Sequence, residues 1–331
     1  MTSATADHIA MKEASLSATA VNGEFLDFAG ERYYVIRNVE QMAPFFISLV
    51  SPEDHWLFAS STGGMTAGRV SAATALFPYI PVDKLHVCGN IRGPRTILRV
   101  GVGDDAVYWE PFNAEQRGRF ATSCSLYKNT LGNKLCYEEL NYDLELAFRY
   151  TWSTSSDYGF IRHCELENLG SSTQQLEVVD GLQNVLPAGT PLFAQTNTSN
   201  LVDAYKWTEL DESTGLAFLT LYSRITDRAE PSESLKATTI FSLGLAQHKT
   251  LISTDQVNSF RQGATLQQES HKRGIRGAYF VNHKCELASG NSKGWSIVLN
   301  AEQSQANAVS LRRSLESPDK VEAEILASVA A

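Results

Sequence analysis

The sequence predicts an all-β protein, a large antiparallel sandwich of two sheets followed by a helical segment at the C-terminus. Apolar and polar side chains alternate over most of residues 25–299, and turn residues separate the alternating runs. Strands and helices do not follow one another in a repeated rhythm, which disfavours a doubly wound parallel sheet. At 331 residues, 43% of them hydrophobic, the chain can bury a sizeable core.

Strands are expected from about residue 25 onward, because residues 1–24 read as a flexible polar tail. The apolar run Phe45–Val50 has the length of a buried strand, and Trp56–Ala59 predicts a second one. The clearest strand signal is Leu144–Trp152, whose even-numbered positions are all large and apolar while the odd ones are mostly polar or small. One face of that strand should therefore lie on the core.

Turn residues predict how the strands are joined. Gly132-Asn133 and the glycine-terminated loop 211–215 each separate two apolar runs, which is typical of hairpins. The alternation recurs in residues 279–287 and 295–299, with Gly290-Asn291 between them. Antiparallel hairpins are expected at all of these places.

The last thirty residues have helical rather than strand character. Residues 301–315 are rich in Ala, Gln, Leu and Arg, and residues 317–319 (Ser-Pro-Asp) supply an N-cap, a first-turn proline and a first-turn acid. Val321, Ile325 and Val329 then lie on one helical stripe. Periodicity leaves two interpretations open: the stripe meets a domain that follows, or the helix folds back on its own sheet.

Composition narrows the function classes. The formal net charge is −9 with 20% charged residues and no basic stripe, so binding to nucleic acid or to an anionic membrane is not supported. The longest apolar run is too short to span a bilayer. Five cysteines without a Cys-x-x-Cys pair argue against a disulfide framework or a zinc ribbon. A reducing, cytoplasmic location is expected, since no secretory signal is evident.

The segment from Ser60 to Tyr79 is the best candidate for a binding surface. It combines a glycine-rich turn with a fixed positive charge and aromatic neighbours, and the nominated residues are Thr62, Gly63, Gly64, Arg69 and Tyr79. Glycines let a backbone approach a ligand closely, and a guanidinium can hold an anion or a row of hydroxyls. The alternative is a plain tight turn. A nucleotide-binding loop is disfavoured, because Arg69 occupies the position of the required lysine.

Other chemistry-bearing residues carry competing structural interpretations. Three histidine–cysteine pairs could bind zinc, but a core role is favoured, and neither a metal nor another cofactor is expected. Carboxylate pairs could flank a glycosidic bond, although alternation with Cys164 and Leu166 favours the solvent-facing side of a strand for Glu165 and Glu167. Four aromatic residues could stack on a sugar ring or pack in the core. These groups are His86/Cys88, His283/Cys285 and His163-Cys164; Glu138-Glu139, Asp143/Glu145 and Glu165/Glu167; and Trp152, Tyr158, Tyr205 and Trp207.

Three segments resemble those of cellobiose phosphorylase-type enzymes, glycoside hydrolase family 94. Residues 57–64 (LFASSTGG) are similar to a Thr-Gly-Gly segment near the start of those enzymes. Residues 165–183 are similar to a strand–turn–strand segment, although Asp180-Gly181-Leu182-Gln183 departs from the family's Trp-containing end. Residues 286–295 resemble the turn before the last strand of the same domain.

The resemblance implies a β-supersandwich of the galactose mutarotase type over residues 25–300, and a helical linker over residues 301–331 that leads to a missing (α/α)6 barrel. The family's catalytic acid lies in that barrel, so no catalytic residue is expected in this chain. The Thr-Gly-Gly loop would face the sugar pocket. The implied partners are an oligosaccharide or sugar phosphate, the catalytic domain of the same polypeptide, and a second copy in a homodimer.

Three functions therefore remain open. The leading hypothesis is a non-catalytic, substrate-shaping and structural domain of a carbohydrate-active enzyme. The second is an aldose 1-epimerase-like enzyme, in which His55 or His163 and a nearby carboxylate exchange protons with the sugar. The third is a free-standing glycan-binding protein that uses its aromatic rings, with Arg69 or Trp207 in the site.

Overall fold

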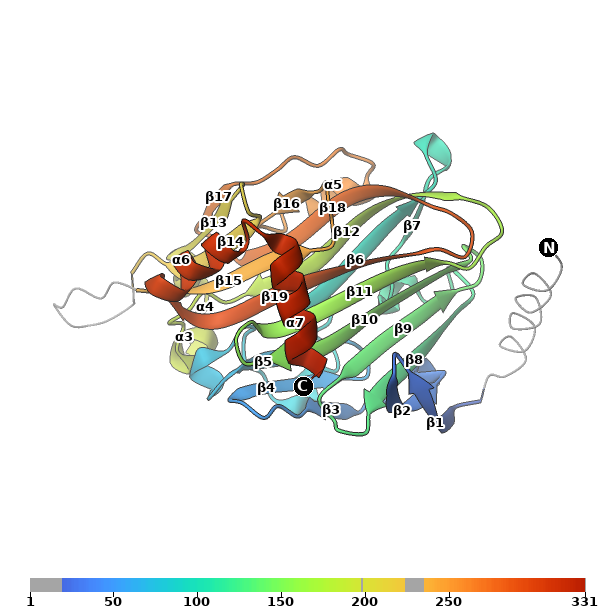
Figure 1. Ribbon diagram of the computed structural model, residues 1–331, viewed down its shortest axis with the longest axis horizontal. Helices are drawn as coiled ribbons and strands as arrows, with labels where there is room; N and C mark the ends of the chain where they lie inside the picture. Colours follow the sequence, from blue (N-terminus) through green and yellow to red (C-terminus); the bar gives the residue numbers. More distant parts are fainter. Residues whose placement is uncertain (1–19, 198, 224–234, 331) are drawn as a thin grey trace.

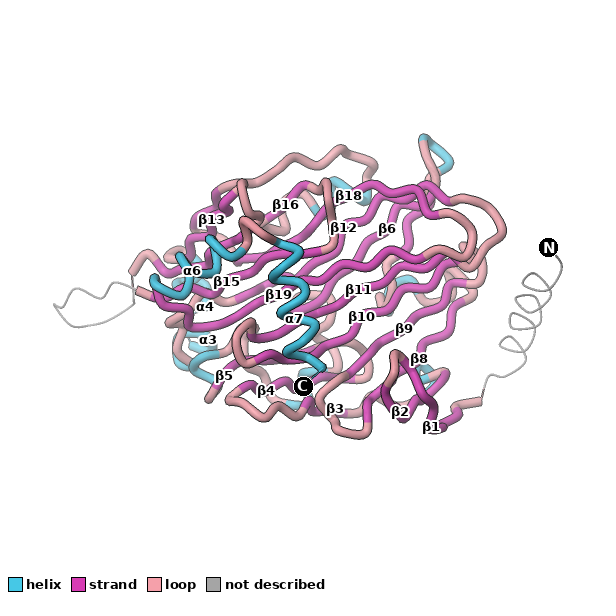
Figure 2. The backbone as a smooth tube through the Cα atoms, viewed as in Figure 1, coloured by secondary structure: helices cyan, strands magenta, loops and turns pink. Residues whose placement is uncertain are grey.

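An eleven-stranded antiparallel sheet runs through the whole molecule (Figure 1). The computed structural model describes residues 20–197, 199–223 and 235–330. A five-stranded sheet and a three-stranded sheet share one hydrophobic core with the large sheet, and the described strands pair with one another in antiparallel fashion. The predicted all-β, antiparallel architecture is confirmed, and strands dominate the backbone in Figure 2.

The strands of the three sheets have the following bounds. In spatial order, the large sheet contains β1 (Asn22–Phe28), β2 (Glu31–Arg37), β8 (Thr122–Asn129), β9 (Leu135–Asn141), β10 (Leu146–Ser155), β11 (Gly159–Asn168), β19 (Ser292–Ser304), β15 (Lys236–Leu243), β14 (Leu216–Leu221), β13 (Lys206–Asp211) and β17 (His271–Arg273). The five-stranded sheet contains β16 (Lys249–Leu251), β18 (Gly277–Leu287), β12 (Gln174–Val185), β6 (Gly93–Val100) and β7 (Val107–Trp109). The small sheet contains β3 (Phe46–Leu49), β4 (His55–Ser60) and β5 (Met65–Arg69).

The helices are short except at the C-terminus. The α-helices are α2 (Val82–Leu85), α3 (Leu192–Asn197), α4 (Ser199–Asp203), α5 (Val257–Arg261), α6 (Gln305–Ser314) and α7 (Pro318–Ala330). The 3-10 turns are η1 (Val39–Gln41), η2 (Ala72–Thr74), η3 (Gly103–Asp105) and η4 (Ala114–Gln116). Among the described residues, no helix is both long and apolar enough to cross a membrane.

The alternation that predicted β10 sorts its side chains as expected. Leu146, Phe148, Tyr150 and Trp152 all lie in the core, each at most 3% exposed. Neighbouring inner faces complete the core, because a strand with one apolar face is stable only when that face is covered. The prediction that one face of this strand lies on the core is therefore confirmed.

The turn signals predicted two hairpins correctly and one wrongly. Residues 130–134 join β8 to β9, and residues 212–215 join β13 to β14, as expected. The turn at Gly290-Asn291, however, connects β18 in the five-stranded sheet to β19 in the large sheet. Both strands have an apolar inner face, so alternation and a local turn cannot distinguish a hairpin from a crossing between sheets.

The C-terminal helix packs on its own sheet. Val321 is 1% exposed and Ile325 is 4% exposed, and both belong to a hydrophobic cluster with Ile161, Phe241 and Val298 on the outer face of the large sheet. Figure 1 shows α7 lying across these strands. Of the two interpretations that periodicity left open, the structure has the second, because strands of this chain cover the stripe. A domain beyond the linker remains a prediction.

Candidate functional site

A cavity of about 870 Å³ opens against the inner face of the large sheet. Strands β8, β9 and β10 contribute residues to it, as do η1, the beginning of β6 and the loop that follows β7. The remaining wall comes from the turn at residues 61–63 and the turn at residues 86–90. This volume suits a small molecule.

Aromatic rings pack together along one side of the cavity. Tyr137 and Tyr150 face each other across β9 and β10, and their rings stack with centroids 5.0 Å apart. The rings of Phe112 and Tyr150 pack edge-to-face, with their centroids 5.3 Å apart. Burial raises the pKa of Tyr137 well above its ordinary value, so this hydroxyl is a neutral donor to the Ser60 carbonyl oxygen at 2.8 Å. The aromatic surface is thus rigidly held.

Two carboxylates meet in the same cavity. Glu139 accepts hydrogen bonds from Trp109 Nε1 at 2.9 Å and from the Phe112 backbone N–H at 2.6 Å. Glu40 accepts the backbone N–H of Cys124 at 3.0 Å, while the thiol of Cys124 points at Glu139. Burial raises the pKa of Glu139, and the negative charge of Glu40 raises it further. The protonated form of Glu139 is therefore favoured relative to that of an exposed glutamate.

Glu139 also explains a strained backbone position. Phe112 has a φ of 62°, in the left-handed region that side chains rarely adopt. The hydrogen bond from its N–H to Glu139 and the contacts of its ring hold it there. Such strain persists only where surrounding contacts impose it, and it is common at ligand sites.

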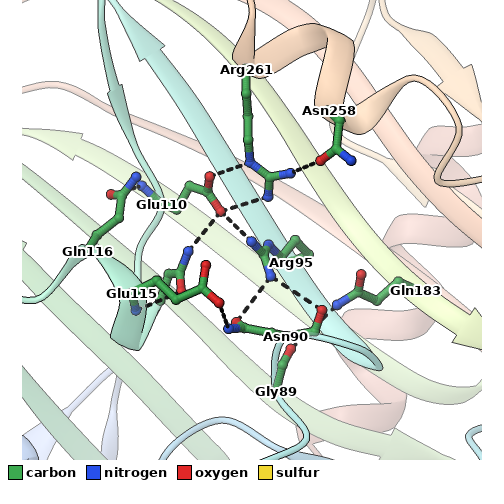
Figure 3. A network of polar contacts seen from close by, with 10 residues as sticks. Gly89, Asn90, Arg95, Glu110, Glu115, Gln116, Gln183, Asn258 and Arg261 are labelled. Atoms are coloured by element: carbon green, nitrogen blue, oxygen red, sulfur yellow. Dashed lines mark hydrogen bonds and ion pairs between the residues drawn. The ribbon is translucent and has the colours of Figure 1, made fainter.

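A third acid of the cavity wall, Glu110, is neutralised by arginines (Figure 3). It accepts Arg95 Nη2 at 2.6 Å and two donors of Arg261, at 2.5 and 2.9 Å. Burial alone would raise the pKa of Glu110, but the bonds and charges of Arg261 and Arg95 lower it below its usual value. Asn90 accepts from Arg95 Nη1 at 3.1 Å, so the network also anchors the turn at residues 86–90.

The structure brings together only part of the predicted site. Thr62 and Gly63 line the cavity, and Gly64 follows them in the same turn. Arg69 lies elsewhere, where its Nε donates to Asp54 at 2.8 Å. Tyr79 is 37% exposed and is not among the lining residues. Whether any of the five contacts a ligand stays a prediction.

His86 belongs to the cavity wall, yet the sequence suggested only a metal pair with Cys88. The thiol of Cys88 instead donates to the Leu85 carbonyl oxygen at 3.3 Å. Across residues 20–197, 199–223 and 235–330, no three His, Cys, Asp or Glu side chains gather into a possible metal site. A single histidine beside a turn leaves no periodic pattern in the sequence, so only the folded structure could place His86 at the cavity.

The other histidines named from the sequence lie outside the cavity. His55 is buried against the Phe160 ring, and burial lowers its pKa to about 4. His163 is exposed on β11 and hydrogen-bonds Ser296. His283 packs edge-on against Trp295 on the core face that the alternation predicted.

The remaining candidate acids and rings also lie apart from the cavity. Glu138, Glu165 and Glu167 form ion pairs with Arg149. The predicted polar strand face is thereby confirmed for Glu165 and Glu167. The Trp207 ring is covered by the Arg273 guanidinium at 3.7 Å. Trp152 is a core residue.

No protein-family model and no curated protein matches the sequence. Among solved structures, a polysaccharide lyase is similar with a TM-score of 0.41 and 11% identity, over 80% of this chain and 33% of that one. A bacterial glucoamylase complexed with acarbose is similar with a TM-score of 0.39 and 8% identity, over 90% of this chain and 38% of that one. A putative aldose 1-epimerase from Escherichia coli K12 has a TM-score of 0.39 and 11% identity, over 79% of this chain and 100% of that one. The chain thus spans about a third of the lyase and of the glucoamylase.

Proposed function

We propose that this chain is a carbohydrate-binding domain and that the cavity is its saccharide site. The supporting observation is the combination of an aromatic side, formed around Tyr150 and Phe112, with a wall of hydrogen-bonding groups that includes His86 and Glu40. A pyranose has an apolar C–H face and a rim of hydroxyls, so it can meet both kinds of surface at once. Ligand sites in general pair an apolar lining with a few placed polar groups.

The charges of the cavity favour a neutral saccharide over a sugar phosphate. Within the described part of the chain, neither Glu40 nor Glu139 forms an ion pair. Of the two arginines in the wall, Arg95 is committed to Glu110 and Arg117 is exposed to solvent. A phosphate or carboxylate inside the cavity would face unpaired negative charge, whereas hydroxyls can donate to it.

The resemblance to cellobiose phosphorylase-type enzymes supports a role within a larger carbohydrate-active protein. In that role the chain would shape a substrate site and provide structure, and bond cleavage would be performed elsewhere. The isolated chain would then bind sugar weakly and would turn none over.

Calorimetry tests the saccharide site. We expect one series among cello-, laminari- and chito-oligosaccharides to bind, and the corresponding sugar phosphate to bind more weakly. Glu40→Gln should weaken binding about tenfold or more, since a hydrogen bond to a charged group contributes roughly 1.5–3 kcal/mol. Glu165→Gln, a half-buried glutamate of the ion-paired strand face, is the matched control and should change little. Absence of binding in every series would remove the proposal.

A second candidate function is aldose 1-epimerase chemistry. One observation favours it, namely that His86 and the carboxyl group of Glu139, with its raised pKa, line the same cavity. A base would take the proton from the anomeric hydroxyl while an acid gives one to the ring oxygen, so that the ring opens and recloses. Polarimetry of freshly dissolved α-glucose or α-galactose is the test. A decay no faster than in buffer eliminates this candidate.

A further inference from the structure

His86 is held in the cavity wall by a closed set of hydrogen bonds. Its Nδ1 lies 2.7 Å from Ser60 Oγ, and Ser60 Oγ lies 2.8 Å from Thr62 Oγ1. Thr62 Oγ1 lies 2.9 Å from the backbone carbonyl oxygen of His86, which closes the ring. Three atom pairs at these distances need three hydrogens, one between each pair.

The position of each hydrogen follows from the number of donors. A carbonyl oxygen can only accept, so the single hydroxyl hydrogen of Thr62 goes to His86 O. Thr62 Oγ1 must then accept from Ser60, whose own single hydrogen is thereby used. The remaining contact, between Ser60 Oγ and His86 Nδ1, therefore requires a hydrogen on Nδ1. A neutral His86 thus carries its proton on Nδ1 and has a free lone pair on Nε2.

The glycines of the same turn serve this arrangement. A Cβ on Gly64 would come within 2.1 Å of the Leu85 carbonyl oxygen and 3.0 Å of Cys88 Sγ, so only glycine lets the turn at residues 86–90 lie this close. Gly63 has a φ of 88°, which glycine adopts without strain. The Thr-Gly-Gly sequence is therefore built to hold the turn that carries His86.

The far side of that turn is fixed as well. Asn90 donates to Glu115 at 3.1 Å and accepts from Arg95, and the Gly89 carbonyl oxygen accepts from Gln183 (Figure 3). His86 is thus clamped between the Thr-Gly-Gly turn and the arginine network. Nε2 of His86 has no hydrogen-bond partner within the described residues.

We infer that Nε2 of His86 is a hydrogen-bond acceptor for a hydroxyl group of the bound saccharide, and that Ser60 and Thr62 are positioning residues that set its tautomer. This inference rests on the proposed function, because it names the group that reads the ligand in the same cavity. It assigns the Thr-Gly-Gly turn an indirect role: the turn acts through His86.

The tautomer can be tested without any ligand, by ¹⁵N–¹H correlation NMR of the full chain. The sequence has seven histidines, and the His86 signals are assigned by their loss in His86→Asn. We expect a protonated Nδ1 and an unprotonated Nε2, opposite to the form that a free histidine side chain favours in water. Thr62→Val frees the Ser60 hydrogen to turn to Nδ1, so the proton should move to Nε2, whereas Thr62→Ser should keep the original form. An Nε2–H tautomer in the unmodified chain overturns the inference.

Binding of the neutral oligosaccharide series tests the role of the acceptor. His86→Asn keeps a donor near Ser60 but removes Nε2, and affinity should fall about tenfold, as for one lost hydrogen bond. His86→Gln can place an oxygen near the Nε2 position and should recover part of that loss. His163→Asn, an exposed histidine outside the cavity, is the matched control. If the unmodified chain binds and His86→Asn binds equally well, this inference fails while the proposed function stands. If the unmodified chain binds no series, both fail.

Discussion

Two arginines on neighbouring strands, one on each face of the large sheet, are held in opposite ways. Arg149 of β10 lies on the polar face, 18% exposed, and contacts Glu138, Glu165 and Glu167 at 2.7–3.1 Å. Arg162 of β11 lies in the core, fully buried, and among the described residues its one carboxylate partner is Asp180, which is fully buried too. Arg149 is thus partly exposed and has three carboxylate partners, whereas the fully buried Arg162 depends on Asp180.

The buried pair is completed by neutral groups. Asp180 also accepts from Thr96 Oγ1 at 2.6 Å and from Trp295 Nε1 at 2.8 Å. The Arg162 guanidinium lies 4.5 Å from the centre of the Tyr150 ring, which lines the cavity. Burial by itself would lower the pKa of Arg162, but Asp180 raises it, so the guanidinium stays charged.

Two adjacent glutamates on β9 show the same contrast between the polar face and the inner face of the sheet. Glu138 binds Arg149 on the polar face, whereas Glu139 turns into the cavity with no ion pair among the described residues and a raised pKa. On the polar face a lost charge leaves other partners and water nearby. In the buried Arg162–Asp180 pair, losing one charge leaves the other uncompensated, which costs far more free energy.

The largest expected effect comes from breaking the buried pair. Asp180→Asn should lower the free energy of unfolding by about 3–5 kcal/mol, because Arg162 is left as a buried, unpaired charge. Urea unfolding measures the change. The double variant Arg162→Met with Asp180→Leu should recover only part of the loss: it removes the unpaired charge, but Thr96 and Trp295 still lose their acceptor. A loss below about 1 kcal/mol in Asp180→Asn would contradict the comparison.

Sequence reasoning predicted the strands of this region but not the pair. Alternation assigned the inner face of β10 correctly, because burial of one strand face leaves a local signal of period two. Asp180 appeared only as a departure from a family pattern, and Arg162 gave no signal. Their pairing joins two sheets and depends on how those sheets face each other, which no local period encodes.

The candidate site shows the same division between local and tertiary information. The glycine-rich turn was found from composition, and Thr62 and Gly63 do line the cavity. His86, Glu40 and Glu139 were not recognised as one group, because η1, the turn after α2 and strand β9 meet only in the folded chain. The apolar stripe of the C-terminal helix was predicted correctly, but periodicity could not show which surface the stripe packs against.

A smaller effect should come from a neutral titratable group inside the sandwich. Burial lowers the pKa of His283 to about 4, so the unfolded chain binds a proton at this residue before the folded chain does. Stability is therefore complete above about pH 6.5 and falls as the pH drops towards 4. In His283→Phe, the loss between pH 7 and pH 4.5 should shrink by about 2 kcal/mol.

Urea unfolding at the two pH values measures this difference. His271→Phe is the control, because His271 is exposed on an edge strand and should leave the pH dependence almost unchanged. An unchanged pH dependence in His283→Phe would mean that the core accepts the protonated imidazole, and the contrast between the two sides of the sheet would weaken.

The smallest effect should come from the polar face. In Glu167→Gln, Arg149 keeps Glu138 and Glu165 as partners, and water reaches the site, so the loss in unfolding free energy should stay below about 1 kcal/mol. It should shrink further at about 1 M NaCl, where the screening length is roughly 3 Å, whereas the loss in Asp180→Asn should hardly change. The two faces should therefore differ in how strongly the loss depends on salt, as well as in the size of the loss. A salt-insensitive loss of several kcal/mol in Glu167→Gln would show that the three glutamates act as one buried network, and the two arginines would then no longer differ in kind.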